Sequence, residues 1–273
     1  MSIGVLAHLC HKGTVQDVAQ KVGSYQFQHV QLALWKAFNE YDFTKPGRLN
    51  PGMAKYIKKE FEKHGSSISV LGCYLHLFER DEKKHQVNKE RYKEMIRYAG
   101  IFGTPIVATE TGKIDSGHFT NEDWAKLKET LQELLEEAEK WGVFIGIEPA
   151  QYHLIDNAKK LRKLIDEVPS SHLGVVLDPG NLITEKNYKN QDVVIEEMFE
   201  LLGEQIVAFQ AKDCFFEEND ELSWVPVGQG HLNYELIFAR LFQHKPHIEI
   251  ILDSVNSDNI LEAQRFIMDR MRK

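Results

Sequence analysis

Cysteine is scarce in this chain of 273 residues, which has three, at Cys10, Cys73 and Cys214. Three widely separated cysteines cannot form the paired framework of a small disulfide-rich domain, and their spacing does not match a zinc site. We interpret them as buried hydrophobic side chains rather than as catalytic thiols. Their small number favours a reducing, cytoplasmic location.

Long apolar runs and an excess of basic residues are also missing. No apolar run approaches the roughly 18 residues of a membrane-spanning helix, and no basic segment precedes the first apolar residues as in a signal peptide. Lys and Arg total 33 against 41 Asp and Glu, so the formal net charge is −8. Because an acidic protein repels phosphate groups, we expect neither nucleic acid nor a membrane as a partner.

Short, β-rich apolar runs recur along the chain, in which 42% of the residues are hydrophobic. There are eight of these runs, and they cover residues 3–7, 27–34, 68–75, 105–109, 143–147, 173–177, 206–209 and 248–252. Most are continuously apolar rather than alternating. This pattern is typical of parallel strands that helices cover on both faces of the sheet.

Segments with helical periodicity separate these strands. The clearest begins with a capping box formed by Thr120 and Asp123 and continues to Trp141. Similar segments cover residues 14–22, 51–64, 88–99, 155–168, 192–202, 234–242 and 258–271. Eight strands that alternate with eight helices predict a single (β/α)8 TIM barrel, as one domain over residues 1–273. The alternative is a doubly wound open sheet, but its usual Gly-rich first turn does not follow Gly4.

Three predicted connections between a strand and the next helix are long, at residues 35–50, 77–87 and 212–231. In barrels, such loops shape the substrate pocket. The first and third are rich in aromatic residues, namely Trp35, Phe38, Tyr41, Phe43, Phe215, Phe216 and Trp224. These side chains fit a pocket wall, a cover over the barrel rim, or a subunit contact in a homo-oligomer equally well.

Polar residues follow most of the predicted strands, so they should converge on the rim where barrel enzymes place their chemistry. Along the chain they are His8, His76, Glu110, Glu148, Asp178, Gln210 and Asp253. The last four come from strands five to eight and should lie side by side. Three neighbouring carboxylates repel one another unless a cation or a proton compensates, so the pattern predicts one divalent metal ion. Oxygen ligands favour Mg²⁺ or Mn²⁺ over Zn²⁺.

Four motifs resemble those of the xylose isomerase-like sugar phosphate isomerases and epimerases. They are Gly146-Ile147-Glu148-Pro149, Leu177-Asp178-Pro179-Gly180-Asn181, Gln210-Ala211-Lys212-Asp213 and Val227-Gly228-Gln229-Gly230. The resemblance spans essentially the whole chain, and it implies a TIM barrel in which a Glu, an Asp, a His and a Glu hold one divalent metal ion. The corresponding ligands in this chain are Glu148, Asp178, Gln210 and Asp253.

Two of these four positions depart from the family pattern. Gln210 stands where the family has His, and its neutral amide oxygen is a weaker ligand than an imidazole. Asp253 stands where the family has Glu and is one methylene shorter. The resemblance also implies that Glu148 and Asp253 exchange the substrate's proton as general bases and acids, while the metal stabilises an enediolate.

The resemblance further implies a small sugar or polyol as the substrate, and isomerisation or epimerisation as the reaction. The residues expected to contact the substrate are Asn181, His8, His76, Glu110 and Lys212. Two alternatives share the fold: a lyase that dehydrates inososes or dehydroshikimate, and a sugar-binding protein that has lost catalysis. The departures at Gln210 and Asp253 motivate the second alternative. A phosphodiesterase of the endonuclease type would need several metals and more His ligands.

Overall fold

The computed structural model describes residues 2–114, 117–216 and 221–271. Its barrel strands are β1 (Ile3–Leu6), β2 (His29–Leu32), β3 (Ser67–Gly72), β4 (Ile106–Thr109), β5 (Phe144–Ile147), β6 (Leu173–Leu177), β7 (Ile206–Ala211) and β10 (Ile250–Leu252). They are parallel and close into a barrel in the order β1-β10-β7-β6-β5-β4-β3-β2. The predicted (β/α)8 TIM barrel is therefore confirmed.

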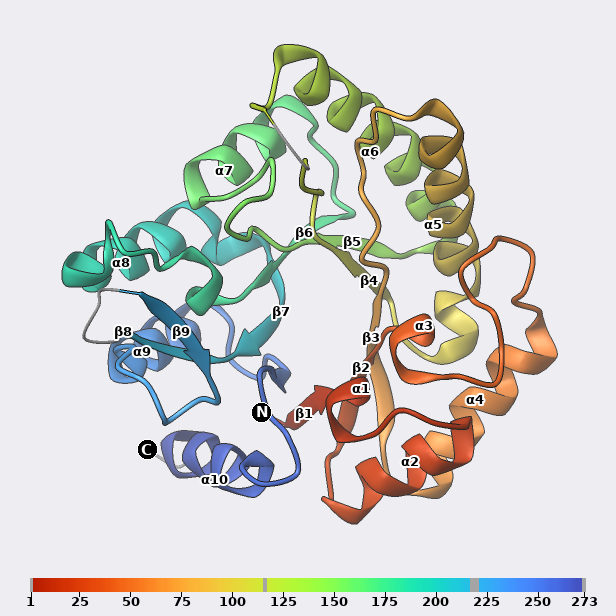
Figure 1. The fold of residues 1–273 in the computed structure, drawn as a ribbon, viewed down its shortest axis with the longest axis horizontal. Helices are drawn as coiled ribbons and strands as arrows, with labels where there is room; N and C mark the ends of the chain where they lie inside the picture. Colours follow the sequence, from red (N-terminus) through yellow and green to blue (C-terminus); the bar gives the residue numbers. More distant parts are fainter. Residues whose placement is uncertain (1, 115–116, 217–220, 272–273) are drawn as a thin grey trace.

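Helices surround the strands, as Figure 1 shows. The long ones are α2 (Val15–Ser24), α4 (Pro51–Lys63), α5 (Glu82–Phe102), α6 (Asn121–Trp141), α7 (Ala158–Glu167), α8 (Gln191–Leu202), α9 (Tyr234–His244) and α10 (Ile260–Met271). The shorter ones are α1 (Ala7–Cys10), α3 (Leu34–Ala37), η1 (Pro179–Leu182), η2 (Tyr188–Asn190) and η3 (Gly203–Gln205). The predicted capping box is present at the start of α6, where Thr120 and Asp123 each accept a backbone N–H of the other.

The three long connections contain more regular structure than the sequence pattern indicates. The segment 35–50 includes most of α3, and α5 begins at Glu82, inside the predicted loop 77–87. The Asp81 side chain caps α5 by accepting from the N–H of Lys84, but the first turn is charged and carries no apolar periodicity. The segment 212–231 contains an antiparallel pair, β8 (Asp213–Phe216) and β9 (Leu222–Val225), which lies outside the barrel.

Apolar side chains fill the barrel below the rim. A compact cluster comes from six strands and consists of Leu6, Val70, Ile106, Ala108, Val176, Ala208 and Ile251. A larger cluster packs the outer face of the strands against the helices. The polar residues at the rim therefore rest on an apolar floor, from which water is largely excluded.

The described part of the chain contains no helix with the length and apolar character needed to cross a membrane. All three cysteines are free, and Cys73 and Cys214 are buried. Burial raises the pKa of the Cys214 thiol to about 12, so it stays protonated and unreactive at neutral pH. This agrees with our interpretation of the cysteines as packing residues.

Candidate functional site

Strand pairing brings the predicted site residues together at the carboxyl ends of the strands. β7 pairs with β10 on one side and with β6 on the other. The register with β10 places Lys212 next to Asp253, and the register with β6 places Gln210 next to Asp178. Glu148 follows β5, the other neighbour of β6. We call Glu148, Asp178 and Asp253, with Lys212 among them, the carboxylate centre.

Glu148 lies deep in this centre and is almost completely buried. The amide nitrogen of Asn181 donates a 2.7 Å hydrogen bond to its Oε1, and that of Gln210 donates a 3.1 Å bond to its Oε2. Burial raises the pKa of Glu148 well above its usual range, and the carboxylates of Glu110 and Asp178 raise it further. Burial and the neighbouring carboxylates thus favour the protonated form of this carboxyl group.

Lys212 supplies a buried positive charge. Its Nζ lies 3.4 Å from Asp178 Oδ2 and 3.5 Å from Asp253 Oδ2, and it donates a 2.5 Å hydrogen bond to Asn181 Oδ1. Although burial alone would lower it, the pKa of Lys212 is raised above its usual range because carboxylates face the ammonium group. Asn181 therefore bridges the ammonium group to the carboxyl group of Glu148.

The two Asp residues differ in their access to solvent. Asp178 is fully buried, its Oδ1 accepts from the backbone N–H of Gly180, and burial raises its pKa to about 7. The Asp253 side chain is 20% exposed, and its Oδ1 accepts from the backbone N–H of Ser254. Ser254 has φ of 58°, a left-handed conformation that turns the chain directly after Asp253. Asp253 is thus the carboxylate of the pair that a substrate can reach.

A second polar network connects the centre to the opposite side of the barrel. Gln210 Nε2 lies 3.1 Å from Gln31 Oε1 and 3.4 Å from the Tyr74 hydroxyl, and Gln31 also donates to that hydroxyl. The Lys36 ammonium group lies 4.1 Å from the centroid of the Tyr74 ring. Tyr74 was not identified from the sequence. Its phenol hydroxyl near the carboxyl end of the run 68–75 is the signal that could have indicated it.

His8 and Glu110 lie at the rim of the barrel, as predicted. His8 is half-buried on α1, and burial and the nearby Lys36 charge lower its pKa to about 4, so its ring is neutral at neutral pH. The Glu110 side chain is 31% exposed, and its Oε1 lies 3.6 Å from His153 Nε2. Both side chains can therefore offer polar atoms to a neutral ligand.

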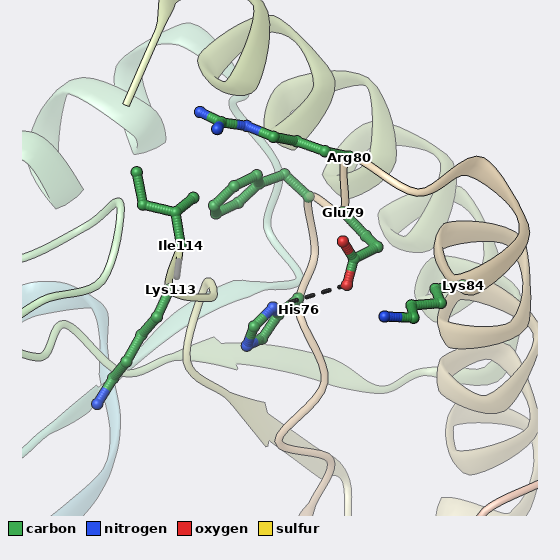
Figure 2. Close-up of a pocket in the computed structure, with 7 residues that line it drawn as sticks. His76, Glu79, Arg80, Lys84, Lys113 and Ile114 are labelled. Atoms are coloured by element: carbon green, nitrogen blue, oxygen red, sulfur yellow. Dashed lines mark ion pairs between the residues drawn. The ribbon is translucent and has the colours of Figure 1, made fainter. Parts of the chain in front are cut away.

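His76 lines a separate cavity between the loops that follow β3 and β4. The cavity has a volume of about 230 Å³ and is lined by His76, Phe78, Glu79, Arg80, Lys84, Lys113 and Ile114. Figure 2 shows His76 facing Glu79, at 4.0 Å, and Lys113 directed away from Arg80. Arg80 is already paired with Asp123 at 2.7 Å. None of the residues of the carboxylate centre lines this cavity.

The aromatic side chains of the long loops differ in position: one fits a pocket wall and others fit a cover over the barrel rim. Trp224 of β9 lies over the centre, with its ring centroid 5.1 Å from Lys212 Nζ, and is 40% exposed, which fits a pocket wall. Phe38 and Phe43 are buried and pack on each other, with their ring centroids 6.3 Å apart, as a cover over the rim would. A homo-oligomer contact stays a prediction.

Asp213, the last residue of the Gln-Ala-Lys-Asp motif, has a structural role. Its carboxylate accepts backbone hydrogen bonds from Cys214 at 2.9 Å, Gly228 at 3.1 Å and Leu232 at 3.0 Å. A Cβ on Gly230 would lie 2.3 Å from Asp213 Oδ1, so only glycine fits there. Asp213 thus ties the start of β8 to the loop that follows β9.

The four predicted metal ligands lie close together, but their arrangement does not fit a divalent ion. Both oxygens of Glu148 accept amide hydrogen bonds, and Gln210 presents its N–H groups rather than its oxygen to Glu148. The Lys212 ammonium group lies between Asp178 and Asp253, where it would repel a cation. Among the residues described, no three or more His, Cys, Asp or Glu side chains form a group that could hold a metal. Mg²⁺ or Mn²⁺ binding by these residues stays a prediction.

Known proteins show where this barrel belongs. Among solved structures, a D-tagatose 3-epimerase-like protein is similar at a TM-score of 0.78 and 18% identity, over 100% of this chain and 97% of that one. A xylose isomerase-like TIM barrel protein from Mycobacterium smegmatis in complex with magnesium has a TM-score of 0.74 and 16% identity, over 94% and 87%. The IolI protein with a bound zinc atom has a TM-score of 0.75 and 15% identity, over 99% and 96%.

Identities this low show a shared fold alone, and no curated protein matches the chain. The family model described as a xylose isomerase-like TIM barrel, however, matches residues 17–270, nearly the whole chain. This agrees with the resemblance of the four sequence motifs. The chain therefore belongs to the xylose isomerase-like TIM barrel family.

Proposed function

We propose that this protein isomerises or epimerises a small sugar or polyol-derived ketone. The observation that carries the proposal is the pair of carboxyl groups at the barrel mouth, one buried at Glu148 and one accessible at Asp253, with the Lys212 ammonium group beside them. Membership of the family supports the proposal, as does the similarity to solved sugar epimerases.

The proposed reaction begins with removal of a proton from the carbon next to the substrate's carbonyl group. One carboxylate takes the proton, the C–H electron pair forms a carbon–carbon double bond, and the carbonyl oxygen becomes the oxyanion of an enediolate. Return of a proton to the opposite face of the same carbon gives the epimer. Transfer of a proton between the two oxygens, followed by protonation of the neighbouring carbon, gives the isomer.

The environments of the two carboxyl groups suit complementary roles. Asp253 lies beside the Lys212 ammonium group and is accessible, which suits a base that meets the substrate. Burial raises the pKa of Glu148, which suits a group that holds a proton and delivers it. We assign the substrate's hydroxyl groups to the polar atoms of His8, Glu110 and Asn181 around this pair.

The cofactor predicted from the sequence is one divalent ion, and two similar structures hold magnesium or zinc. The donors in this chain do not fit such an ion, because amides and an ammonium group already face the carboxylates. The proposed proton transfers therefore rely on the chain's own residues.

One observation favours the non-catalytic alternative. Both oxygens of Glu148 already accept hydrogen bonds, so this carboxyl group must release an amide before it can exchange a proton. A sugar-binding protein would keep both bonds in its complex. The two functions differ in whether the bound ligand exchanges hydrogen with solvent.

The deciding experiment incubates the protein in deuterated water with a panel of ketohexoses, ketopentoses and inososes, and follows the carbon next to the carbonyl group by NMR. We expect deuterium at that carbon, together with an epimer or an isomer. The Glu148→Gln variant should lower the exchange rate by at least about 100-fold, the usual share of general acid–base catalysis. The matched control Glu129→Gln, at an exposed position on α6, should retain the wild-type rate.

Other outcomes identify the alternatives. Loss of water to give an unsaturated product indicates the lyase. Binding of a panel member by calorimetry without deuterium incorporation indicates the sugar-binding protein. Neither binding nor exchange with any member of the panel refutes the proposal for these substrate classes.

A further inference from the structure

We propose that the ammonium group of Lys212, and not a divalent metal ion, is the cation of the carboxylate centre. The inference deepens the proposed function and relies on it only for the catalytic consequence. The assignment of Lys212 as the cation rests on the geometry of the centre alone.

The ammonium group lies where the carboxylates converge. Lys212 Nζ contacts one oxygen of Asp178 at 3.4 Å, one of Asp253 at 3.5 Å and the amide oxygen of Asn181 at 2.5 Å. The ammonium group thus donates a hydrogen bond to Asn181 and forms ion pairs with both Asp carboxylates. Asp178 Oδ2 is buried and has no hydrogen-bond partner among the described residues, so this ion pair is its compensation.

The surrounding chain is shaped to hold this lysine. A Cβ on Gly180 would lie 2.9 Å from Lys212 Cγ and 3.3 Å from Lys212 Cε, so the absence of a side chain at Gly180 leaves room for the aliphatic part of the lysine. The Tyr234 hydroxyl donates a 2.7 Å hydrogen bond to the carbonyl oxygen of Lys212 and fixes its backbone. The Trp224 ring lies on the ammonium group, 5.1 Å from centroid to Nζ.

The remaining side of the centre is also filled by donors. Gln210 directs its amide N–H groups to Glu148 Oε2 and to Gln31 Oε1, each at 3.1 Å. A metal ligand at this position would instead have to present a lone pair. Together, Lys212, Gln210 and Asn181 meet the acidic oxygens with N–H groups, which is the role that a metal ion would otherwise have.

The catalytic consequence concerns the enediolate oxygen. Asp253 is the accessible partner of the ammonium group, so the N–H that faces Asp253 is the one that a substrate oxygen can reach. When a substrate oxygen accepts this N–H, the positive charge meets the developing oxyanion, and Asp253 is free to take the proton from carbon. Lys212 gives up no proton in this step and remains an ammonium ion.

Metal binding, measured without substrate, tests the inference. Protein stripped with EDTA is titrated with Mn²⁺, Mg²⁺ and Zn²⁺ by calorimetry, and Tm is followed with each ion. We expect the wild-type protein to show no 1:1 binding tighter than a Kd of about 1 mM. The Lys212→Met variant leaves Asp178 and Asp253 without a positive partner, so it should bind Mn²⁺ at least about tenfold more tightly and gain Tm on its addition.

Lys36→Met is the matched control, because it removes a lysine at the same rim that has no ion pair with either Asp, and it should behave as the wild type does. Stoichiometric Mn²⁺ binding by the wild type that Asp178→Asn abolishes would overturn the inference. So would a folded Lys212→Met variant with no gain in metal affinity. If Lys212→Met does not fold, Lys212→Gln and the wild-type titration decide in the same way.

The outcomes separate this inference from the proposed function. If the protein shows the expected metal behaviour but exchanges no hydrogen with any ketone, Lys212 stands as the cation and the proposed function is refuted. If the protein exchanges hydrogen into the ketone only when a metal ion is bound, the proposed function stands and the inference about Lys212 is refuted.

Discussion

Gln210 donates a 3.1 Å hydrogen bond to Glu148 at the mouth of the barrel. The bond gives a buried carboxyl group a neutral donor, and it engages the N–H group of the Gln210 amide. Gln210, which stands where the resemblance implies a His, is therefore a direct partner of Glu148. Substitutions at this pair and around it should separate the structural and catalytic roles.

Gln210→His should not by itself create a metal site, because the Lys212 ammonium group still lies between the two Asp side chains. In the Lys212→Met background the same change should tighten Zn²⁺ or Co²⁺ binding by about tenfold relative to Lys212→Met alone, since an imidazole is a better ligand for these ions. Calorimetric titration of the single and double variants measures this difference. Tight metal binding by Gln210→His alone would contradict it.

Asn181→Leu should destabilise the fold. The substitution leaves Glu148 Oε1 without its donor and removes one of the acceptors of Lys212, and each unsatisfied buried group costs about 1–3 kcal/mol. Chemical denaturation should show a loss of free energy of unfolding in that range. Asn39→Leu, at an exposed position, is the control and should change stability by less than about 0.5 kcal/mol. Equal effects of the two substitutions would speak against the bridge.

Gly180→Ala should displace Lys212, because the added Cβ would lie 2.9 Å from Lys212 Cγ and 3.1 Å from Asp178 Oδ1. We expect a stability loss of about 1–3 kcal/mol, as for other additions to a filled core, together with slower hydrogen exchange into substrate. Gly100→Ala is the matched control, since Gly100 lies inside helix α5 and its added Cβ would have no atom of another element within 4 Å. That change should stabilise the protein by roughly 0.5–1 kcal/mol. If both variants lost stability, crowding between the added Cβ and Lys212 would not explain the effect of Gly180→Ala.

Acid should destabilise the protein through His153. Burial lowers the pKa of His153 to about 3, while an unfolded His titrates near 6.5. Between these values the unfolded chain binds a proton that the folded chain does not, so this contribution is complete above pH 6.5 and is lost as the pH falls toward 3. The slope from this one group is about 1.4 kcal/mol per pH unit.

His153→Asn should reduce that slope, because its amide oxygen can still accept the backbone N–H of Gly112, which His153 Nδ1 accepts at 3.1 Å, but does not titrate. Denaturant unfolding between pH 4 and pH 7 measures the slope. His11→Asn, at an exposed position, should leave it unchanged. An identical pH dependence of wild type and His153→Asn would show that another group controls acid stability.

The barrel could be predicted from the sequence because its strands carry a strong local signal. The run 173–177 has the bounds of β6, and the capping box at Thr120 starts α6 as expected. The β8–β9 hairpin was not predicted, because its strands are short and lie outside the apolar interior. The loop that follows them is held by Asp213, whose carboxylate accepts from Gly228 and Leu232, two partners that are distant in sequence.

The positions of the site residues followed from the fold, whereas their partners did not. A strand end at Glu148 or Asp253 can be identified from the pattern, because the carboxyl ends of parallel strands meet at one rim. Which atoms face each other depends on side-chain torsions. Lys212 was expected from the sequence to contact the substrate, which stays a prediction, but its ion pairs with two Asp carboxylates could not be foreseen. The hydroxyl of Tyr74 was missed for the same reason.

The attachment of the β8–β9 hairpin has an evolutionary consequence. The carboxyl groups of Glu148 and Asp178 come from barrel strands that the hairpin does not join, while the hairpin presents Trp224 to the centre and its first strand is tied through Asp213 to the loop that follows β9. Insertions, deletions and exchanges between β8 and β9 can therefore change which ligands enter without altering the groups that act on them. Diversification of ligand choice in descendants of this barrel can proceed by replacing one surface module while Asp213 is kept.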